Sequence, residues 1–172
     1  MISGVVKYGV QFVFLVLLQG LVLNNIHVFG VASTYFYVLF ILLLPVEYNK
    51  VVVLFLAFFL GLSVDLFSSS WGLHAFSSVF LAFLRPLLLR FLAPRDGYEF
   101  NSSPNWSTMG FGWFVTYAAI GVFIHHFTIH LVEAFRFSEV LNVFGRASAS
   151  TIFTLIIALL AQLFTYRPNR TL

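Results

Sequence analysis

The most informative stretch of the sequence runs from Phe59 to His74 and reads FLGLSVDLFSSSWGLH. It places one carboxylate, Asp65, near the end of an otherwise apolar segment, and a turn of small residues then leads into a second apolar segment. A carboxylate in such surroundings is costly unless a partner compensates for the lost water. The fold around Asp65 must therefore supply that partner.

The composition indicates an integral membrane protein. Of the 172 residues, 60% are hydrophobic, 9% are charged and 23 are Phe, and the mean hydropathy is +0.98. A soluble domain of this size could not bury so many apolar side chains in one core. The sequence has no Cys, which excludes disulfides, thiolate metal sites and thiol catalysis. The net charge is +3, and the basic residues are scattered over segment ends, which does not favour a nucleic-acid partner.

Hydropathy predicts one membrane domain over residues 1–172, an all-α bundle of about six transmembrane helices. Roughly 20 mostly apolar residues span the hydrocarbon layer, and polar breaks mark the ends of each span. The second span is short, and residues 137–144 are expected to form a separate short helix in the outer interface. The predicted helices cover residues 5–23, 31–45, 51–67, 73–92, 108–132 and 147–166.

The distribution of Lys and Arg predicts the orientation. If the amino terminus is cytoplasmic, seven of the nine Lys and Arg residues fall on the inner side, and Arg136 and Arg146 lie outside. We therefore expect both termini in the cytoplasm. Asp65 follows Lys50 by 15 residues, so at about 1.5 Å per residue it lies about 22 Å up a span of about 30 Å, just beneath the outer surface.

A spacing of four residues places Ala57, Gly61 and Asp65 on one helix face. Gly61 lets another helix approach closely, and Asp65 can then accept a hydrogen bond from it. The expected donor is a polar group of the outer half such as His74 or His126. The acid is thus interpreted as a packing determinant of the hairpin formed by the third and fourth helices.

The turn between these helices is rich in small residues. Ser69 or Ser70 is expected to cap the fourth helix, because hydroxyl side chains satisfy free N–H groups at helix starts. The predicted structural motif of the hairpin comprises Gly61, Asp65, Gly72 and His74.

The sequence resembles the MreD family of bacterial rod shape-determining membrane proteins. The similarity covers the length and the number of segments, and its specific part lies between Pro45 and Arg90. It rests on Leu44-Pro45 at the end of the second helix, on Gly61-Leu62-x-x-Asp65-Leu66, and on Gly72-Leu73-His74-Ala75 at the start of the fourth.

The resemblance implies a non-enzymatic scaffold subunit of the cell-elongation (rod) complex, involved in the regulation of cell shape and peptidoglycan synthesis. It implies a multi-pass protein of the bacterial inner (cytoplasmic) membrane. The implied partners are an MreC-like bitopic membrane protein and, indirectly, MreB filaments and the RodA/penicillin-binding protein synthase. The implied fold is similar to that of the substrate-binding subunits of energy-coupling-factor transporters.

Arg85 precedes Pro86 inside the fourth helix. It lies roughly 10 Å from Asp65 along the membrane normal, beyond comfortable reach. We expect its side chain to extend toward the cytoplasm, to Glu47. It is also a candidate anchor for a cytoplasmic partner or an anionic lipid headgroup.

The sixth helix carries a stripe of small residues, which lets another helix come close in lipid. The stripe serves either packing inside the bundle or docking of a partner's single helix. Its candidate docking residues are Ala147, Thr151, Thr154, Ala158 and Ala161.

Three polar residues of the fifth helix, His126, His130 and Glu133, share one face at a spacing that a metal site could use. The signal is weak, because the Glu of a metallopeptidase motif is missing between the two His residues. The favoured interpretation is that of interfacial or hydrogen-bonded packing histidines. We expect no metal and no other cofactor.

Catalysis finds little support. An intramembrane hydrolase would have to use Ser70, His74 and Asp65, and the sequence has neither a paired-carboxylate set inside its helices nor a Gly-rich phosphate loop. We therefore expect no enzymatic activity. The alternative to a scaffold is a small-molecule-binding membrane subunit of a transporter, with Asp65, His74 and the other outer histidines lining a pocket.

Overall fold

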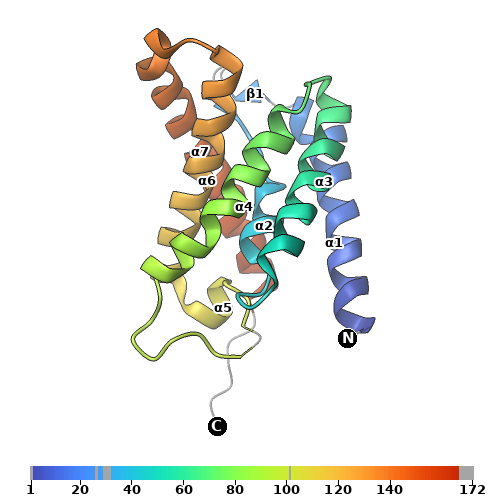
Figure 1. Ribbon diagram of the computed structural model, residues 1–172, viewed down its shortest axis with the longest axis vertical. Coiled ribbons are helices and arrows are strands. Elements are labelled where there is room, and N and C mark those ends of the chain that lie inside the picture. Colours follow the sequence, from blue (N-terminus) through green and yellow to red (C-terminus); the bar gives the residue numbers. More distant parts are fainter. Residues whose placement is uncertain (1, 26, 29–31, 101, 167–172) are drawn as a thin grey trace.

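The computed structural model, which describes residues 2–25, 27–28, 32–100 and 102–166, is a helical bundle with a partly extended segment at its centre (Figure 1). Among these described residues, five helices are long and apolar enough to cross a membrane, by length and composition. They are α1 (Ile2–Leu21), α3 (Lys50–Ser68), α4 (Leu73–Phe91), α6 (Phe111–Ala134) and α7 (Val140–Thr165). The shorter elements are η1 (Leu23–Asn25), β1 (His27–Val28), β2 (Ala32–Ser33), α2 (Val38–Leu43), α5 (Trp106–Met109) and η2 (Phe137–Glu139).

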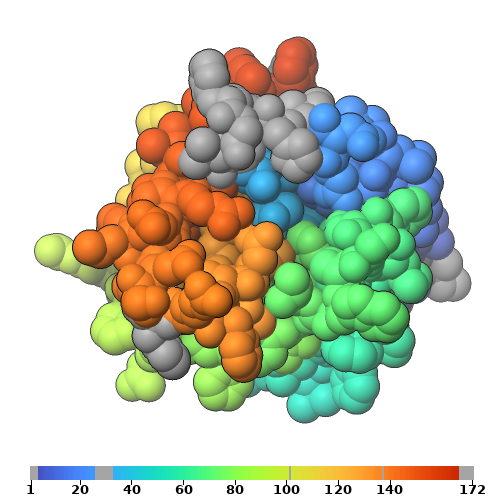
Figure 2. All heavy atoms as spheres, turned by 90° about the horizontal axis from the view of Figure 1, so that it is seen from above, coloured from blue at the N-terminus to red at the C-terminus, as the bar shows by residue number. Residues whose placement is uncertain are grey.

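The chain runs back and forth between two ends of the bundle (Figure 1). At the lower end α1 begins and α7 ends, while the upper end carries β1, the α3–α4 turn and the α6–α7 turn. In the view onto the upper end, these parts surround a light-blue patch that belongs to the start of the central segment (Figure 2). Large apolar side chains cover the outside of the bundle, as contact with lipid requires, and include Val5, Phe55, Leu66, Phe83, Phe91 and Phe164.

The hairpin of α3 and α4 matches the prediction to within one residue at each helix end. Other boundaries differ, and α1 covers Ile2–Leu21 in place of the predicted 5–23. The predicted interfacial helix at 137–144 is wrong, because Val140 already belongs to α7, which continues unbroken to Thr165. The fifth predicted span begins later than expected, at Phe111, after the separate turn of α5.

The predicted helix at 31–45 is wrong. Residues 32–45, here called the central segment, form β2, an irregular stretch and then α2, which has six residues. Leu44 ends α2 with an extended ψ of 147°, the conformation favoured by a residue that precedes a proline. The central segment passes down the middle of the bundle, between the long helices (Figure 1). The fully buried ones include Tyr37, Val38, Ile41, Leu42 and Leu44.

Candidate functional site

Asp65 is a helix cap. The residue is 3% exposed, and its Oδ1 accepts hydrogen bonds from the Ser70 hydroxyl at 2.7 Å and the His74 backbone N–H at 3.0 Å. Its Oδ2 accepts from the backbone N–H of Ala75 at 3.0 Å. The carboxylate therefore satisfies free N–H groups at the start of α4, where its negative charge also suits the helix dipole. The expected donor, a His74 or His126 side chain, is wrong.

The turn residues have different roles from those predicted. Ser69 does not cap α4 but ends α3 in the left-handed conformation, with φ 52°, and Ser70 binds Asp65. Gly72 has φ 84° and is the N-cap residue of α4, yet it has no side chain to cap with. Asp65 takes over that function from the preceding helix.

Gly61 marks the closest approach of the two helices. A Cβ at this position would lie 2.5 Å from Cα and 2.6 Å from N of Ala75 and would also meet the His74 carbonyl oxygen. Those atoms belong to the backbone and cannot rotate away. The structure thus brings Gly61, Asp65, Gly72 and His74 together in one hairpin, as the sequence predicts.

Side chains of the surrounding helices bind the backbone of the central segment. Gln19 of α1 donates from Nε2 to the Thr34 carbonyl at 2.8 Å, and its Oε1 accepts from the Phe36 N–H at 2.9 Å. Non-helical backbone at membrane depth is tolerated where it is buried in protein that satisfies its polar groups. Gln19, which is itself fully buried, meets this requirement on both sides of Tyr35.

Two further backbone N–H groups are bound through matching chains of side chains from α7 and α6. In the first, the Tyr35 N–H donates to the Thr154 hydroxyl oxygen at 3.3 Å, which lies 3.1 Å from Nε2 of His126. His126 donates from Nδ1 to the Val122 carbonyl at 2.8 Å. In the neutral ring Nε2 then accepts the Thr154 proton, so every group in the chain has a partner.

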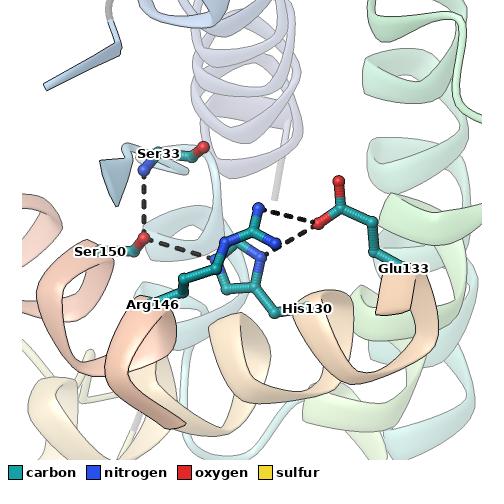
Figure 3. A network of polar contacts seen from close by, with 5 residues as sticks. All are labelled: Ser33, His130, Glu133, Arg146 and Ser150. Carbon is teal, nitrogen blue, oxygen red and sulfur yellow. Dashed lines mark hydrogen bonds and ion pairs between the residues drawn. The ribbon is translucent and has the colours of Figure 1, made fainter. Parts of the chain in front are cut away.

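The second chain has the same order (Figure 3). The Ser33 N–H donates to the Ser150 hydroxyl oxygen at 3.1 Å, which lies 3.4 Å from Nε2 of His130. His130 Nδ1 lies 3.3 Å from Oε2 of Glu133, and Nη2 of Arg146 lies 3.2 Å from the same oxygen. This chain thus connects strand β2 with the partly exposed pair of Glu133 and Arg146.

The two chains fit together because of their spacing. The bound N–H groups are two residues apart along the non-helical part of the central segment, and the hydroxyl and His residues are four apart on helices, a rise of about 6 Å. Two residues of the central segment therefore match one turn of helix. This register assigns Ser33 to Ser150 and His130, and Tyr35 to Thr154 and His126.

Tyr37 joins two further histidines. Its hydroxyl oxygen lies 2.9 Å from Nδ1 of His74 and 2.8 Å from Nε2 of His125, and all three residues are buried. Since the phenol has one proton, it donates to one ring and accepts from the other. The contact ties the central segment to α4 and α6 at the level just below the Asp65 cap.

Arg85 binds the lower end of the central segment. It is 2% exposed, and its guanidinium donates to the carbonyls of Leu44 and Pro45 and, from Nε, to the Tyr117 hydroxyl at 3.2 Å. Tyr117 in turn donates to the Leu42 carbonyl at 3.1 Å. The Leu42 and Leu44 carbonyls lie at the end of α2, where acceptors lack helical partners and a cation also suits the helix dipole.

The expectation for Arg85 is therefore corrected, and of the two alternatives for the α7 stripe the packing one is observed. Arg85 does not extend to Glu47, and its burial leaves no guanidinium surface for a partner or a headgroup. The α7 stripe packs inside the bundle, where Thr154 is fully buried and binds the central segment. Ala147, Thr151 and Ala158 are buried as well, and Ala161 is partly buried against the core.

No group of three His, Asp or Glu side chains that could hold a metal ion occurs among the residues that the structure describes. Within the candidate set, His130 and Glu133 are in contact, but both ring nitrogens of His126 are engaged by Val122 and Thr154. A hydrolytic arrangement is not formed either. Ser70 donates to Asp65, and the His74 ring is bound to Tyr37.

A polar pocket of about 330 Å³ opens near the upper end. Its lining includes Asn24, Asn25, Tyr35, Ser68 and His74. The pocket therefore reaches His74, whose ring contacts the buried Tyr37 hydroxyl. Its size and polar lining offer room for a small polar molecule.

Sequence reasoning missed three residues that hold the central segment, Gln19, Tyr37 and Tyr117. A signal existed for Gln19, since a polar side chain deep in an apolar span needs an internal partner. Comparison with known proteins finds no matching family model, curated protein or solved structure.

Proposed function

We propose that this chain is a non-enzymatic scaffold subunit of the bacterial cell-elongation (rod) complex, involved in the regulation of cell shape and peptidoglycan synthesis. The observation that carries the proposal is the role of Asp65. The acid of the motif that resembles the MreD family is a buried helix cap with three donors, so the motif has a structural reason that needs no reaction. A rigid membrane domain of this kind is suited to present binding surfaces to partner proteins.

The proposed membrane arrangement has six crossings, five by helices and one by the central segment. An even number returns the chain to its starting side, in accord with the positions of the start of α1 and the end of α7 (Figure 1). The lower end carries Lys7, Lys50 and Arg90, which favours the cytoplasm for that side. The proposed location is the inner membrane, and the proposed fold relatives are the substrate-binding subunits of energy-coupling-factor transporters.

The proposed direct partner is an MreC-like bitopic membrane protein, and through it MreB filaments and the RodA/penicillin-binding protein synthase. Depletion of the chain in its rod-shaped host tests the function, and rounded cells are the expected result. Re-expression of the unchanged chain should restore rods, whereas Asp65→Leu should not. Retention of the rod shape after depletion would contradict the proposal.

A second candidate is a small-molecule-binding membrane subunit of a transporter, favoured by the polar pocket of about 330 Å³ beside His74. Affinity capture from host membranes separates the two functions. A scaffold should recover a single-span protein with a periplasmic domain, and a transporter subunit should recover an ATPase module. Recovery of the ATPase module alone would replace the first proposal by the second.

A further inference from the structure

A second cavity, here called the lower slot, lies between α1 and α7 in the lower half of the bundle. It has a volume of about 460 Å³. Lys7 and Gln11 of α1 line one side, Ala161 and Gln162 of α7 line the other, and Leu39 of α2 lies between them. One water molecule takes about 30 Å³ of liquid, so the lower slot is large enough for an acyl chain of a lipid.

The lining changes from polar to apolar along the direction of the helices. Lys7 and Tyr8 belong to the lower part of α1, and the slot is also lined there by Ser103 and Asn105 of the lower loop. Leu15 follows Lys7 by eight residues, which is about 12 Å of helix. At that height the lining is apolar and includes Phe14, Leu15, Phe36 and Leu39. A phospholipid has the same gradient over one leaflet, which is half of about 30 Å.

At the polar end of the lower slot, Lys7 has no ion pair with an acidic side chain among the described residues. Within the described part of the chain the ion pairs lie at the upper end and involve Glu133 and Glu139, and none includes Lys7. Lys7 Nζ lies 5.5 Å from the ring centroid of Tyr8. Gln11, one turn above it on the same face, has no hydrogen-bond partner among the described residues. Together these side chains offer an ammonium and an amide donor to an anion.

We propose that the lower slot binds one anionic phospholipid of the lower leaflet, with its phosphate beside Lys7 and Gln11 and an acyl chain along Leu15, Phe36 and Leu39. The gradient of the lining and the uncompensated cation fit this occupant, and the volume of about 460 Å³ admits one of its acyl chains. A partner helix fits less well, because close helix contact in lipid uses small residues on the facing wall. Ala161 and Thr165 of α7 are small, but the α1 wall of the lower slot presents the long side chains of Lys7, Tyr8, Gln11, Phe14 and Leu15.

The test uses the full chain in nanodiscs of phosphatidylcholine with a minor fraction of phosphatidylglycerol, released into mild detergent and examined by native mass spectrometry. The unchanged chain should retain one phosphatidylglycerol. Lys7→Gln should lower this retention about fivefold, the factor that corresponds to the ~1 kcal/mol of one Lys at an anionic lipid surface. Lys50→Gln removes the same charge at the same end but outside the lower slot, and should retain the lipid.

A steric pair tests the acyl part. Ala161→Phe fills the lower slot and should expel the lipid, whereas Leu160→Phe enlarges a side chain on the neighbouring face, which is 52% exposed, and should not. Thermal unfolding of each variant shows that the fold is intact. Equal retention by Lys7→Gln and the unchanged chain, or equal retention of phosphatidylcholine and phosphatidylglycerol, would overturn the proposal. So would a cross-link from position 161 to a co-purified single-span protein in place of lipid.

Discussion

The hydroxyl oxygen of Thr154 accepts a hydrogen bond from the backbone N–H of Tyr35 at 3.3 Å. This contact joins non-helical backbone in the middle of the bundle to the small-residue face of α7. The stripe of α7 thus has an internal role, since its hydroxyls replace the hydrogen bonds that a helix would have made for itself in the central segment.

Thr154→Val keeps the shape of the side chain but removes both the acceptor for Tyr35 and the donor to His126. A buried N–H without a partner costs about 1–3 kcal/mol, so thermal unfolding in detergent should occur at a lower temperature. The Tyr35 amide should also exchange its hydrogen faster in mass spectrometry.

Thr165→Val is the matched control for this variant. The Thr165 hydroxyl is exposed and bonds to Ala161 of its own helix, so its loss should change stability by no more than about 0.5 kcal/mol. An unfolding temperature of Thr154→Val equal to that of the control would show that the hydroxyl does not hold the central segment.

Arg85→Leu should destabilise the protein more strongly, because it removes the side-chain donor to the Leu44 carbonyl and the contact with the Tyr117 hydroxyl. The expected cost is about 1–3 kcal/mol for a carbonyl that stays buried. The stability of Arg85→Lys should lie between those of Arg85→Leu and the unchanged chain, since an ammonium keeps the charge but not the planar set of donors. Accumulation in membranes and thermal unfolding measure both effects.

Arg90 provides the comparison for Arg85, as it lies on the same helix and is exposed. Arg90→Leu should leave the unfolding temperature nearly unchanged. If the two leucine variants behave alike, burial of the Arg85 guanidinium does not contribute to stability.

The sequence predicts α3 and α4 accurately, because long apolar runs separated by a polar turn have one simple solution in a membrane. It does not predict the central segment, whose hydropathy is the same whether it is helical or extended. The difference is decided by side chains remote in the sequence. Ser150 and Thr154 lie 117 and 119 residues from the backbone groups that they bind.

The hairpin motif shows the same limit at closer range. Spacing places Gly61 and Asp65 on one face and Gly72 in the turn, and the structure has them there. Spacing does not identify the donors to Asp65, which are mainly backbone N–H groups. Backbone amides have no sequence signature. A prediction from sequence therefore names side chains such as His74 as the donors to Asp65.

Substitution by Ala should change the stability by different amounts at three glycines of the bundle. Gly61→Ala forces its Cβ against the backbone of Ala75, which should cost about 1–3 kcal/mol or more. Gly121→Ala meets the end of the Leu42 side chain, which can move, so its cost should be smaller. Gly112→Ala meets nothing within 4 Å and should stabilise α6 by about 1 kcal/mol. Thermal unfolding of the three variants gives the order, and an unfolding temperature of Gly61→Ala at or above that of Gly112→Ala would contradict the close α3–α4 contact.

Asp65 permits the sharpest test of the hairpin, because its two oxygens have separate partners. Asp65→Leu leaves the N–H groups of His74 and Ala75 and the Ser70 hydroxyl without their acceptor. Loss of a helix cap costs about 0.5–2 kcal/mol, and burial of the freed N–H groups adds to it. Asp65→Asn keeps the acceptor for Ser70 and His74 but turns an amide NH₂ toward Ala75, so its unfolding temperature should lie between those of Asp65→Leu and the unchanged chain.

Ser63→Ala is the control for both Asp65 variants, because its exposed hydroxyl bonds only to Phe59 of the same helix. Hydrogen exchange adds a local measurement, in which the first amides of α4 should lose protection in Asp65→Leu while the middle of α6 keeps it. This result separates loss of the cap from general unfolding. If Asp65→Asn is as unstable as Asp65→Leu, the charge of the carboxylate at the helix N-terminus matters more than its geometry as an acceptor. If neither variant differs from Ser63→Ala, the cap does not stabilise the hairpin, and the structural explanation of the motif fails.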